Sequence, residues 1–268
     1  MDRTSLTPRN YGYGFISTVA LILFVIASVC EITFSALGIR EVELALKALL
    51  VPLLLFNTLG IIFRDKGDRN AAVVVSLALV FHCIGDILME FPEKMFLYAM
   101  GAFLVGHIVL QIYFIQRIGK QHFPGNMVWA ISAVLSGLAA LWISPEKGMI
   151  LPVIVYALVL LYYPACGICG LSEYSRSLRK GENISPLRKP AYLHVIFGGL
   201  LFIISDGLIG LSAFKGMSVP SFGVMVMATY LCAEFLLTRG LWKLSLCPPS
   251  EGEQARRKER EEEENFDE

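Results

Sequence analysis

The sequence predicts an all-α membrane protein, a bundle of eight transmembrane helices with both termini in the cytoplasm. Three observations support this fold class. Hydrophobic residues make up 55% of the 268 positions. Runs of about 20 mostly apolar residues, each long enough to cross the hydrocarbon core as a helix, recur from Phe15 onward. Most charged residues fall in short clusters between these runs and at the C-terminal end, and no room remains for a separate catalytic domain.

Breaks in the apolar runs define eight expected spans. They are 15–38, 42–63, 70–90, 94–116, 126–143, 150–172, 189–212 and 217–244. The first run follows Arg3 and Arg9 as a signal peptide would, but it is longer than a signal-type apolar core, so we expect it to be retained. We therefore divide the chain into an N-terminal segment 1–14, a transmembrane domain 15–244 and a charged tail 245–268. The tail has almost no apolar residues with which to form a core and is expected to be disordered.

Lysine and arginine residues predict the orientation of the bundle, because short loops rich in these residues stay in the cytoplasm. The N-terminal segment, every second loop and the C-terminal side carry several of them, whereas each loop in between carries one. This alternation places both termini in the cytoplasm, together with the Asn183-Ile184-Ser185 sequon, which we expect to be unmodified. The formal net charge is zero and no basic cluster is interleaved with aromatic residues, so no nucleic-acid partner is expected.

Ionisable side chains inside the spans are the most informative functional signal. Each is costly to place in the membrane, so by default such a residue faces the protein interior and serves function. The deep ones are Glu31, Lys47, His82, Asp86, His107, Asp206 and Glu234.

Asp86 and Asp206 are expected to lie at the same depth, in the non-cytoplasmic half of the membrane. Both follow the cytoplasmic start of their span by a similar number of residues. Their local sequences also match, IGDIL at 84–88 against ISDGL at 204–208. The two segments occupy corresponding places in a four-plus-four division of the helices, which indicates a parallel internal repeat.

Helical spacing places further polar residues beside these aspartates. His82 precedes Asp86 by four residues and Tyr230 precedes Glu234 by four, so each pair shares one helical face. Lys47 enters from the outer end of its span and would pair with the carboxylates or with a substrate phosphate. Together they predict a polar pocket open to the non-cytoplasmic side. The alternative is an ion-paired or hydrogen-bonded network that only fixes helix packing.

Metal and redox chemistry are both weaker interpretations. Of the four histidines, only His82 and His107 can meet near mid-membrane, where they could hold a metal together with one or two aspartates. We expect instead a hydrogen-bonded interior network, with no metal and no cofactor. Cys166 and Cys169 have the spacing of a redox pair but lack a βαβ context, so the cysteines are interpreted as small buried hydrophobes.

The chain resembles the lysoplasmalogenase family of eight-helix membrane proteins, the YhhN-like or transmembrane protein 86 type. The resemblance spreads over the second to the eighth span, and Lys47 with Pro52 looks like the lysine and proline of that family. Its other motifs are Gly85-Asp86-Ile87-Leu88, Gly101 through Phe103 to His107, Ile204-Ser205-Asp206 and Tyr230-Leu231-Cys232-Ala233. The sequence departs from the family where Leu110 and Leu231 replace expected tyrosines and where Glu234 replaces the usual glutamine.

The resemblance implies an ether hydrolase that cleaves the vinyl ether bond of lysoplasmalogens. The products would be a fatty aldehyde and glycerophosphoethanolamine or glycerophosphocholine, formed in the endoplasmic reticulum membrane if the protein is from an animal. Vinyl ether hydrolysis begins by protonation of an alkene carbon, and water then captures the resulting oxocarbenium ion. The reaction therefore needs one carboxylic acid and one carboxylate, and two close aspartates in a low dielectric supply both, because their mutual repulsion favours one shared proton.

On this basis Asp86 and Asp206 are the expected catalytic pair. We favour Asp86 as the acid, because His82 one turn earlier could relay a proton to it, with Asp206 stabilising the cation and orienting water. Lys47 would hold the phosphate. The expected substrate-binding residues are Lys47, His82, His107, Ser205, Tyr230 and Glu234.

The main alternative function is a transporter or channel for a small solute, lipid or proton, because intramembrane Asp, Lys and His residues also build ion pathways. A lipid-binding or assembly scaffold without chemistry is a third interpretation. The expected partners are a lysophospholipid substrate and membrane lipid, with a homodimer left open.

Overall fold

The computed structural model of the protein describes residues 14–118, 124–143, 147–217 and 221–248. Residues 1–13 and 249–268 lie outside the described residues. They include most of the N-terminal segment and most of the tail for which the sequence predicts disorder. The described helices begin at Phe15 and end at Ser245.

Eight α-helices and one short 3₁₀ helix make up the described residues, which contain no strand. The elements are α1 (Phe15–Leu37), α2 (Arg40–Arg64), α3 (Arg69–Met89), α4 (Pro92–Ile118), α5 (Pro124–Ile143), η1 (Lys147–Met149), α6 (Ile150–Arg179), α7 (Arg188–Lys215) and α8 (Phe222–Ser245). The predicted all-α fold class and the number of helices are confirmed. Seven of the helices are long and apolar enough to cross a membrane, whereas the apolar stretch of α5, Ala130–Ile143, is shorter. The side of the membrane on which the termini lie stays a prediction.

Local sequence explains several of the helix ends. Gly38 adopts a left-handed conformation (φ 71°) that ends α1, and its backbone N–H donates to the carbonyls of Phe34 and Ser35. Asp68 caps the start of α3, since its side chain accepts a hydrogen bond of 3.0 Å from the backbone N–H of Asn70. The largest difference from the expected spans is α6, which continues from its apolar run to Arg179. Its last turns are polar, so the end of the helix can extend beyond the hydrocarbon.

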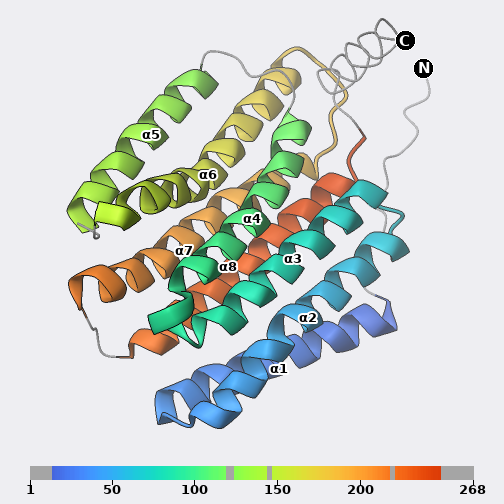
Figure 1. Cartoon of the computed structure of the whole chain (residues 1–268). Coiled ribbons are helices and arrows are strands. Elements are labelled where there is room, and N and C mark those ends of the chain that lie inside the picture. The colour runs from blue at the N-terminus through green and yellow to red at the C-terminus, as the bar shows by residue number, and fades with distance from the viewer. Residues whose placement is uncertain (1–13, 119–123, 144–146, 218–220, 249–268) are drawn as a thin grey trace, which may run out of the picture.

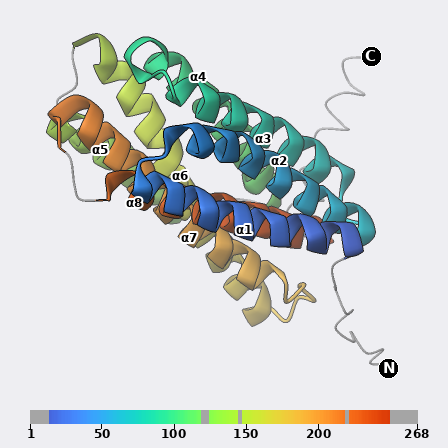
Figure 2. The ribbon, with the colours of Figure 1, turned by 90° about the horizontal axis from the view of Figure 1, so that it is seen from below.

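The helices pack as a bundle in which neighbours in sequence are mostly neighbours in space (Figure 1). α1 and α2 form a pair on one side, α5 lies beside α6 on the other, and α8 is the most buried of the seven spans. Figure 2, turned by 90°, shows α1 crossing the bundle beside α2 and α8.

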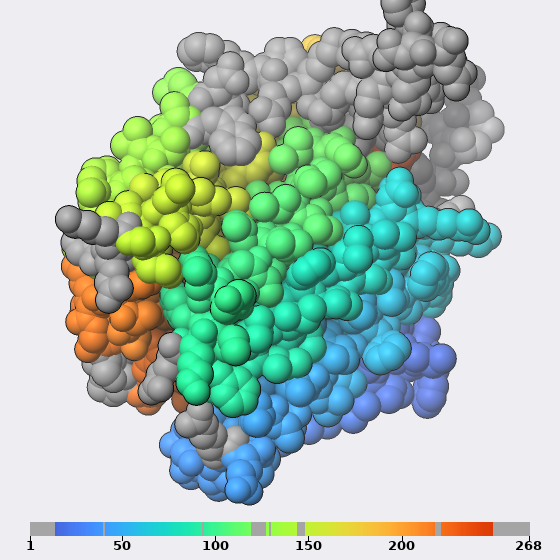
Figure 3. Space-filling model, in the orientation of Figure 1, coloured from blue at the N-terminus to red at the C-terminus, as the bar shows by residue number. Residues whose placement is uncertain are grey.

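The two faces of α3 illustrate how this bundle divides lipid from interior. Val73, Leu77, Val80 and Ile84 are exposed at helical spacing, as expected for a stripe that contacts lipid. The opposite face is buried and includes Ala71, Val75, Ala78, Leu79, His82 and Gly85. Figure 3 shows the outer surface of the bundle on this side, with α3 between α2 and α4. The interior face of α3 therefore carries its polar residue His82 toward α4 and α8.

Arginine side chains close one end of the bundle, the end that the charge pattern predicts to be cytoplasmic. Arg188 on α7 donates to the carbonyl of Arg117 at 2.9 Å and to that of Pro248 at 2.7 Å. Arg117 at the end of α4 in turn donates to the carbonyls of Leu244 and Cys247. These bonds hold the end of α8 against α4 and α7.

Candidate active site

Two adjoining cavities lie at the end of the bundle opposite these arginines. The first, here called the polar cavity, has a volume of ≈ 390 Å³ and is lined by the last turns of α3 and α7 and the first turns of α2, α4 and α8. The second, the apolar cavity, has a volume of ≈ 360 Å³ and lies among α4, α5, α6 and α7. Apart from Asp206 and Tyr156 its walls are aliphatic or aromatic carbon and sulfur-bearing side chains and glycine. Met89, Phe96, Phe103, Asp206 and Ile209 border both cavities.

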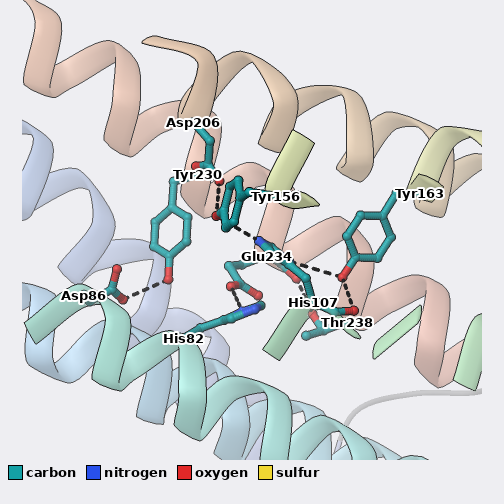
Figure 4. A network of polar contacts seen from close by, with 9 residues as sticks. All are labelled: His82, Asp86, His107, Tyr156, Tyr163, Asp206, Tyr230, Glu234 and Thr238. Carbon is teal, nitrogen blue, oxygen red and sulfur yellow. Dashed lines mark hydrogen bonds and ion pairs between the residues drawn. The ribbon is translucent and has the colours of Figure 1, made fainter. Parts of the chain in front are cut away.

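Asp86 and Asp206 both border the polar cavity, and each accepts a hydrogen bond from a tyrosine (Figure 4). Tyr230 on α8 donates to Oδ2 of Asp86 at 2.8 Å. Tyr156 on α6 donates to Oδ2 of Asp206 at 2.6 Å. Both aspartates are partly buried rather than enclosed. Two carboxyl groups, one on α3 and one on α7, thus border one cavity, and Asp206 lies where this cavity meets the apolar one.

Lys47 also borders the polar cavity, where it is held by two carboxylates. Its Nζ lies 2.9 Å from Oε1 of Glu43, one turn earlier on α2, and 2.8 Å from Oε1 of Glu90 at the end of α3. The sequence predicted a cation here but not these partners. Ser205, the neighbour of Asp206, lines the same cavity and donates to the carbonyl of Val226 on α8 at 3.2 Å.

The other predicted site residues, His82, His107 and Glu234, lie behind the aspartates. Each is 0% exposed, and none is among the residues that line the two cavities. Nδ1 of His82 makes a short contact with Oε1 of Glu234. The His82 and His107 rings lie with their centroids 4.6 Å apart, and Nδ1 of His107 lies 3.2 Å from the Tyr163 hydroxyl. We call His82, His107, Tyr163 and Glu234 the buried polar layer.

Comparison with known proteins places this architecture in a family. A model of the YhhN family matches residues 42–241, from the first turn of α2 nearly to the end of α8. The chain belongs to the YhhN family. The resemblance identified from the sequence is thereby confirmed, and the match contains both cavities and the buried polar layer.

One curated relative of this YhhN protein is "Lysoplasmalogenase TMEM86B" of the mouse, which is 30% identical over 161 residues. The aligned region covers 60% of this chain and 59% of the mouse protein. No solved structure matches the chain at a significant level.

Glycine residues in this YhhN protein allow the helices of the site to approach closely. A Cβ at Gly85 would lie 2.7 Å from the ring of Phe103, and a Cβ at Gly106 would overlap the ring of His82. Both positions need glycine, because no side chain has room between α3 and α4 there. The contact at Gly106 lets the His82 ring lie against the backbone of α4, beside the ring of His107.

Sequence reasoning missed Tyr156 and Tyr163, the α6 residues that complete the site. They are seven residues apart in the sequence, so they lie on one face of α6. A tyrosine inside a span also needs a partner for its hydroxyl. That signal was available but could not identify the partners, because they come from α4 and α7.

Two further predicted features have a clear position in this YhhN protein. Glu31 is buried on α1, and its carboxylate has no hydrogen-bond partner among the described residues. It precedes the segment that the family model matches. His82 and His107 meet as expected, yet the described residues hold no group of three His, Cys, Asp or Glu side chains arranged to bind a metal.

Proposed function

We propose that the protein is a lysoplasmalogenase-like hydrolase that cleaves the vinyl ether bond of lysoplasmalogens. The observation that carries this proposal is Asp206 at the border between a polar and an apolar cavity. A lysoplasmalogen has a phosphate-bearing head and a single long chain, and its vinyl ether bond joins the two. With the head in the polar cavity and the chain in the apolar one, this bond would lie beside Asp206.

The chemistry of the walls supports that binding mode. Lys47 offers a cation for the phosphate, and Glu43 and Glu90 offer carboxylates for the ammonium of the head group. The apolar cavity, lined by residues such as Leu135, Leu160 and Phe214, would exclude water from the chain. The printed name of the mouse relative supports the same activity.

Acid catalysis by the two aspartates accounts for the reaction. One carboxylic acid protonates the alkene carbon and converts the vinyl ether to an oxocarbenium ion. The other, ionised carboxylate stabilises this cation and orients the attacking water, as a carboxylate pair does for the related cation in glycosidases. The hemiacetal that forms then releases a fatty aldehyde and the glycerophospholipid head.

The test is fatty-aldehyde release from a lysoplasmalogen by the purified full-length protein in detergent. The saturated alkyl-ether analogue is the control, since it cannot form the same cation. We expect aldehyde from the vinyl ether alone. If the folded protein releases none, but moves solute into sealed vesicles, the protein is a transporter and the hydrolase proposal fails.

A further inference from the structure

We propose that Asp206 is the proton donor and that Asp86 is the carboxylate that receives the proton from water. This assignment rests on the proposed hydrolysis and reverses the sequence-based preference for Asp86 as the acid. That preference assumed that His82 relays a proton to Asp86. In the structure Nδ1 of His82 is bound to Glu234 instead, and no described contact joins His82 to Asp86.

The argument starts from His107, whose hydrogen position is fixed by Tyr163. The Tyr163 hydroxyl donates to the backbone carbonyl of His107 at 3.2 Å, and its oxygen lies 3.2 Å from Nδ1 of the same histidine. A carbonyl can only accept, so we assign the one hydroxyl proton of Tyr163 to it. Nδ1 must then carry the hydrogen and donate, which leaves Nε2 of neutral His107 as an acceptor.

Nε2 of His107 is directed at Tyr156, so the Tyr156 hydroxyl has two acceptors within reach (Figure 4). Its oxygen lies 2.6 Å from Oδ2 of Asp206 and 3.5 Å from Nε2 of His107. One hydroxyl proton cannot serve both, and the distances show that it lies on the Asp206 side. If Asp206 takes up a proton, the Tyr156 hydroxyl can turn to His107 while its oxygen accepts from Asp206.

Asp86 lacks this second arrangement. Tyr230 donates to it at 2.8 Å, and within the described part of the chain that hydroxyl makes no other hydrogen bond. A donor with one acceptor always favours the ionised carboxylate. Asp206 therefore has a partner that adapts to both protonation states, which a proton donor requires, whereas the partner of Asp86 favours the base.

The full cycle balances with these roles. The Asp206 proton bonds to the alkene carbon that is β to the ether oxygen, using the π electrons, and the adjacent carbon becomes the oxocarbenium ion. Water attacks that carbon and gives a proton to Asp86. When the hemiacetal collapses, Asp206 takes its hydroxyl proton and Asp86 protonates the leaving glycerol oxygen as the carbon–oxygen bond breaks. Both aspartates thus return to their starting forms.

The test is the pH dependence of kcat/KM for aldehyde release. Activity should fall at high pH as Asp206 loses its proton and at low pH as Asp86 gains one. The titratable or charged groups around the pair come from α2, α3, α4, α6 and α8, whereas α5 lines the apolar cavity with Leu135, Ala139 and Ile143. These groups are Glu43, Lys47, His82, Cys83, Glu90, His107, Tyr156, Tyr163, Tyr230 and Glu234.

Two variants should move the high-pH limb in opposite directions. In His107→Phe, Tyr156 can donate only to Asp206, so the ionised form of Asp206 is favoured. The high-pH limb should therefore move to lower pH by roughly one unit. In Tyr156→Phe the donor to Asp206 is gone, so the same limb should move to higher pH by a similar amount. Tyr163→Phe frees the hydrogen on His107 and should act in the direction of His107→Phe, which covers the case in which the histidine variant does not fold.

Tyr230→Phe is the matched control, because it removes the same hydroxyl from the other aspartate. It should raise the pH of the low-pH limb and leave the high-pH limb unchanged. If instead Tyr230→Phe moves the high-pH limb and the His107 and Tyr156 variants move the low one, Asp86 is the acid and the assignment is wrong. Unchanged profiles in all four variants would also reject it.

A second measurement separates this assignment from the proposed function. Wild-type turnover in D2O should place one deuterium on the aldehyde carbon next to the carbonyl. Without labelled aldehyde the hydrolase proposal itself fails. Labelled aldehyde with the reversed response of the limbs leaves the hydrolase intact and overturns only the roles of the two aspartates.

Discussion

The aspartates at the cavity and the buried polar layer behind them differ in what they can contact. Asp86 and Asp206 border a cavity, and each is held by one tyrosine. His82 and Glu234 lie less than two helical turns away in sequence from Asp86 and Tyr230, respectively, yet they are fully enclosed and bind each other. These four ionisable residues therefore fall into two groups, one that borders a cavity and one that contacts only neighbouring side chains.

Loss of either cavity aspartate should have the largest effect on turnover. Asp86→Asn and Asp206→Asn keep the shape of the side chain but remove the acid or the base. We expect kcat/KM for lysoplasmalogen to fall by about a thousandfold or more, the usual size of a general acid–base contribution. The measurement is aldehyde release, with thermal unfolding in detergent as the check on folding. Full activity in both variants would remove the aspartate pair from the mechanism.

In the buried polar layer, by contrast, the larger effect should be on stability. Glu234→Leu leaves Nδ1 of His82 enclosed without its partner and should lower the free energy of unfolding by about 1–3 kcal/mol. Glu234→Gln keeps an acceptor for that nitrogen and should cost less. Thermal unfolding of both variants in detergent measures this difference. A thousandfold loss of turnover in folded Glu234→Gln would mean that this residue takes part in the chemistry.

Two glycines on α7 allow the buried polar layer to be compared with a cavity wall within one helix. A Cβ at Gly199 would overlap the Cβ of Tyr163 in the buried polar layer and would lie 2.8 Å from Cδ of Pro164. Gly207 lines the apolar cavity and has nothing within 4 Å of that position. Gly199→Ala should therefore destabilise the protein by about 1–3 kcal/mol. Gly207→Ala should leave stability unchanged or raise it by up to about 1 kcal/mol, because alanine favours the helix. Equal unfolding temperatures for the two variants would contradict the close packing seen at Gly199.

The helices could be predicted from the sequence because each span is an apolar run of membrane-spanning length with polar breaks on either side, and side chains within a helix repeat at a fixed period. The same periodicity correctly put His82 and Asp86 on one side of α3. It could not choose their partners, since these depend on how α3, α4 and α8 are rotated about their axes. Gly106 leaves room for the His82 ring and so fixes part of that rotation. Nothing in the sequence distinguishes it from the other glycines among the 23 in the chain.

The position of Lys47 shows the same limit. An intramembrane lysine predicts a nearby anion, and two cavity aspartates were the obvious choice from the sequence. Glu90 takes that place because α3 continues to the same end of the bundle, where its last carboxylate meets α2. From its apolar pattern alone, Glu90 marks the end of a span and not a residue of the site. Residues at helix ends are poorly assigned by apolar patterns, because the hydrocarbon boundary does not mark where a cavity begins.

The smallest predicted effect concerns this lysine. Since Glu43 and Glu90 already neutralise Lys47, a phosphate must compete with both carboxylates for it. Lys47→Met should therefore raise KM by only about three- to tenfold, with kcat little changed.

Glu90→Gln releases part of the lysine charge but removes one carboxylate that would bind an ammonium. Its effect should depend on the head group: KM should fall for an alkenyl lysophosphatidic acid, which has no ammonium, and rise for the ethanolamine lysoplasmalogen. Parallel KM measurements with the two lipids test this, and a shift of equal sign for both would mean that Glu90 does not contact the head group.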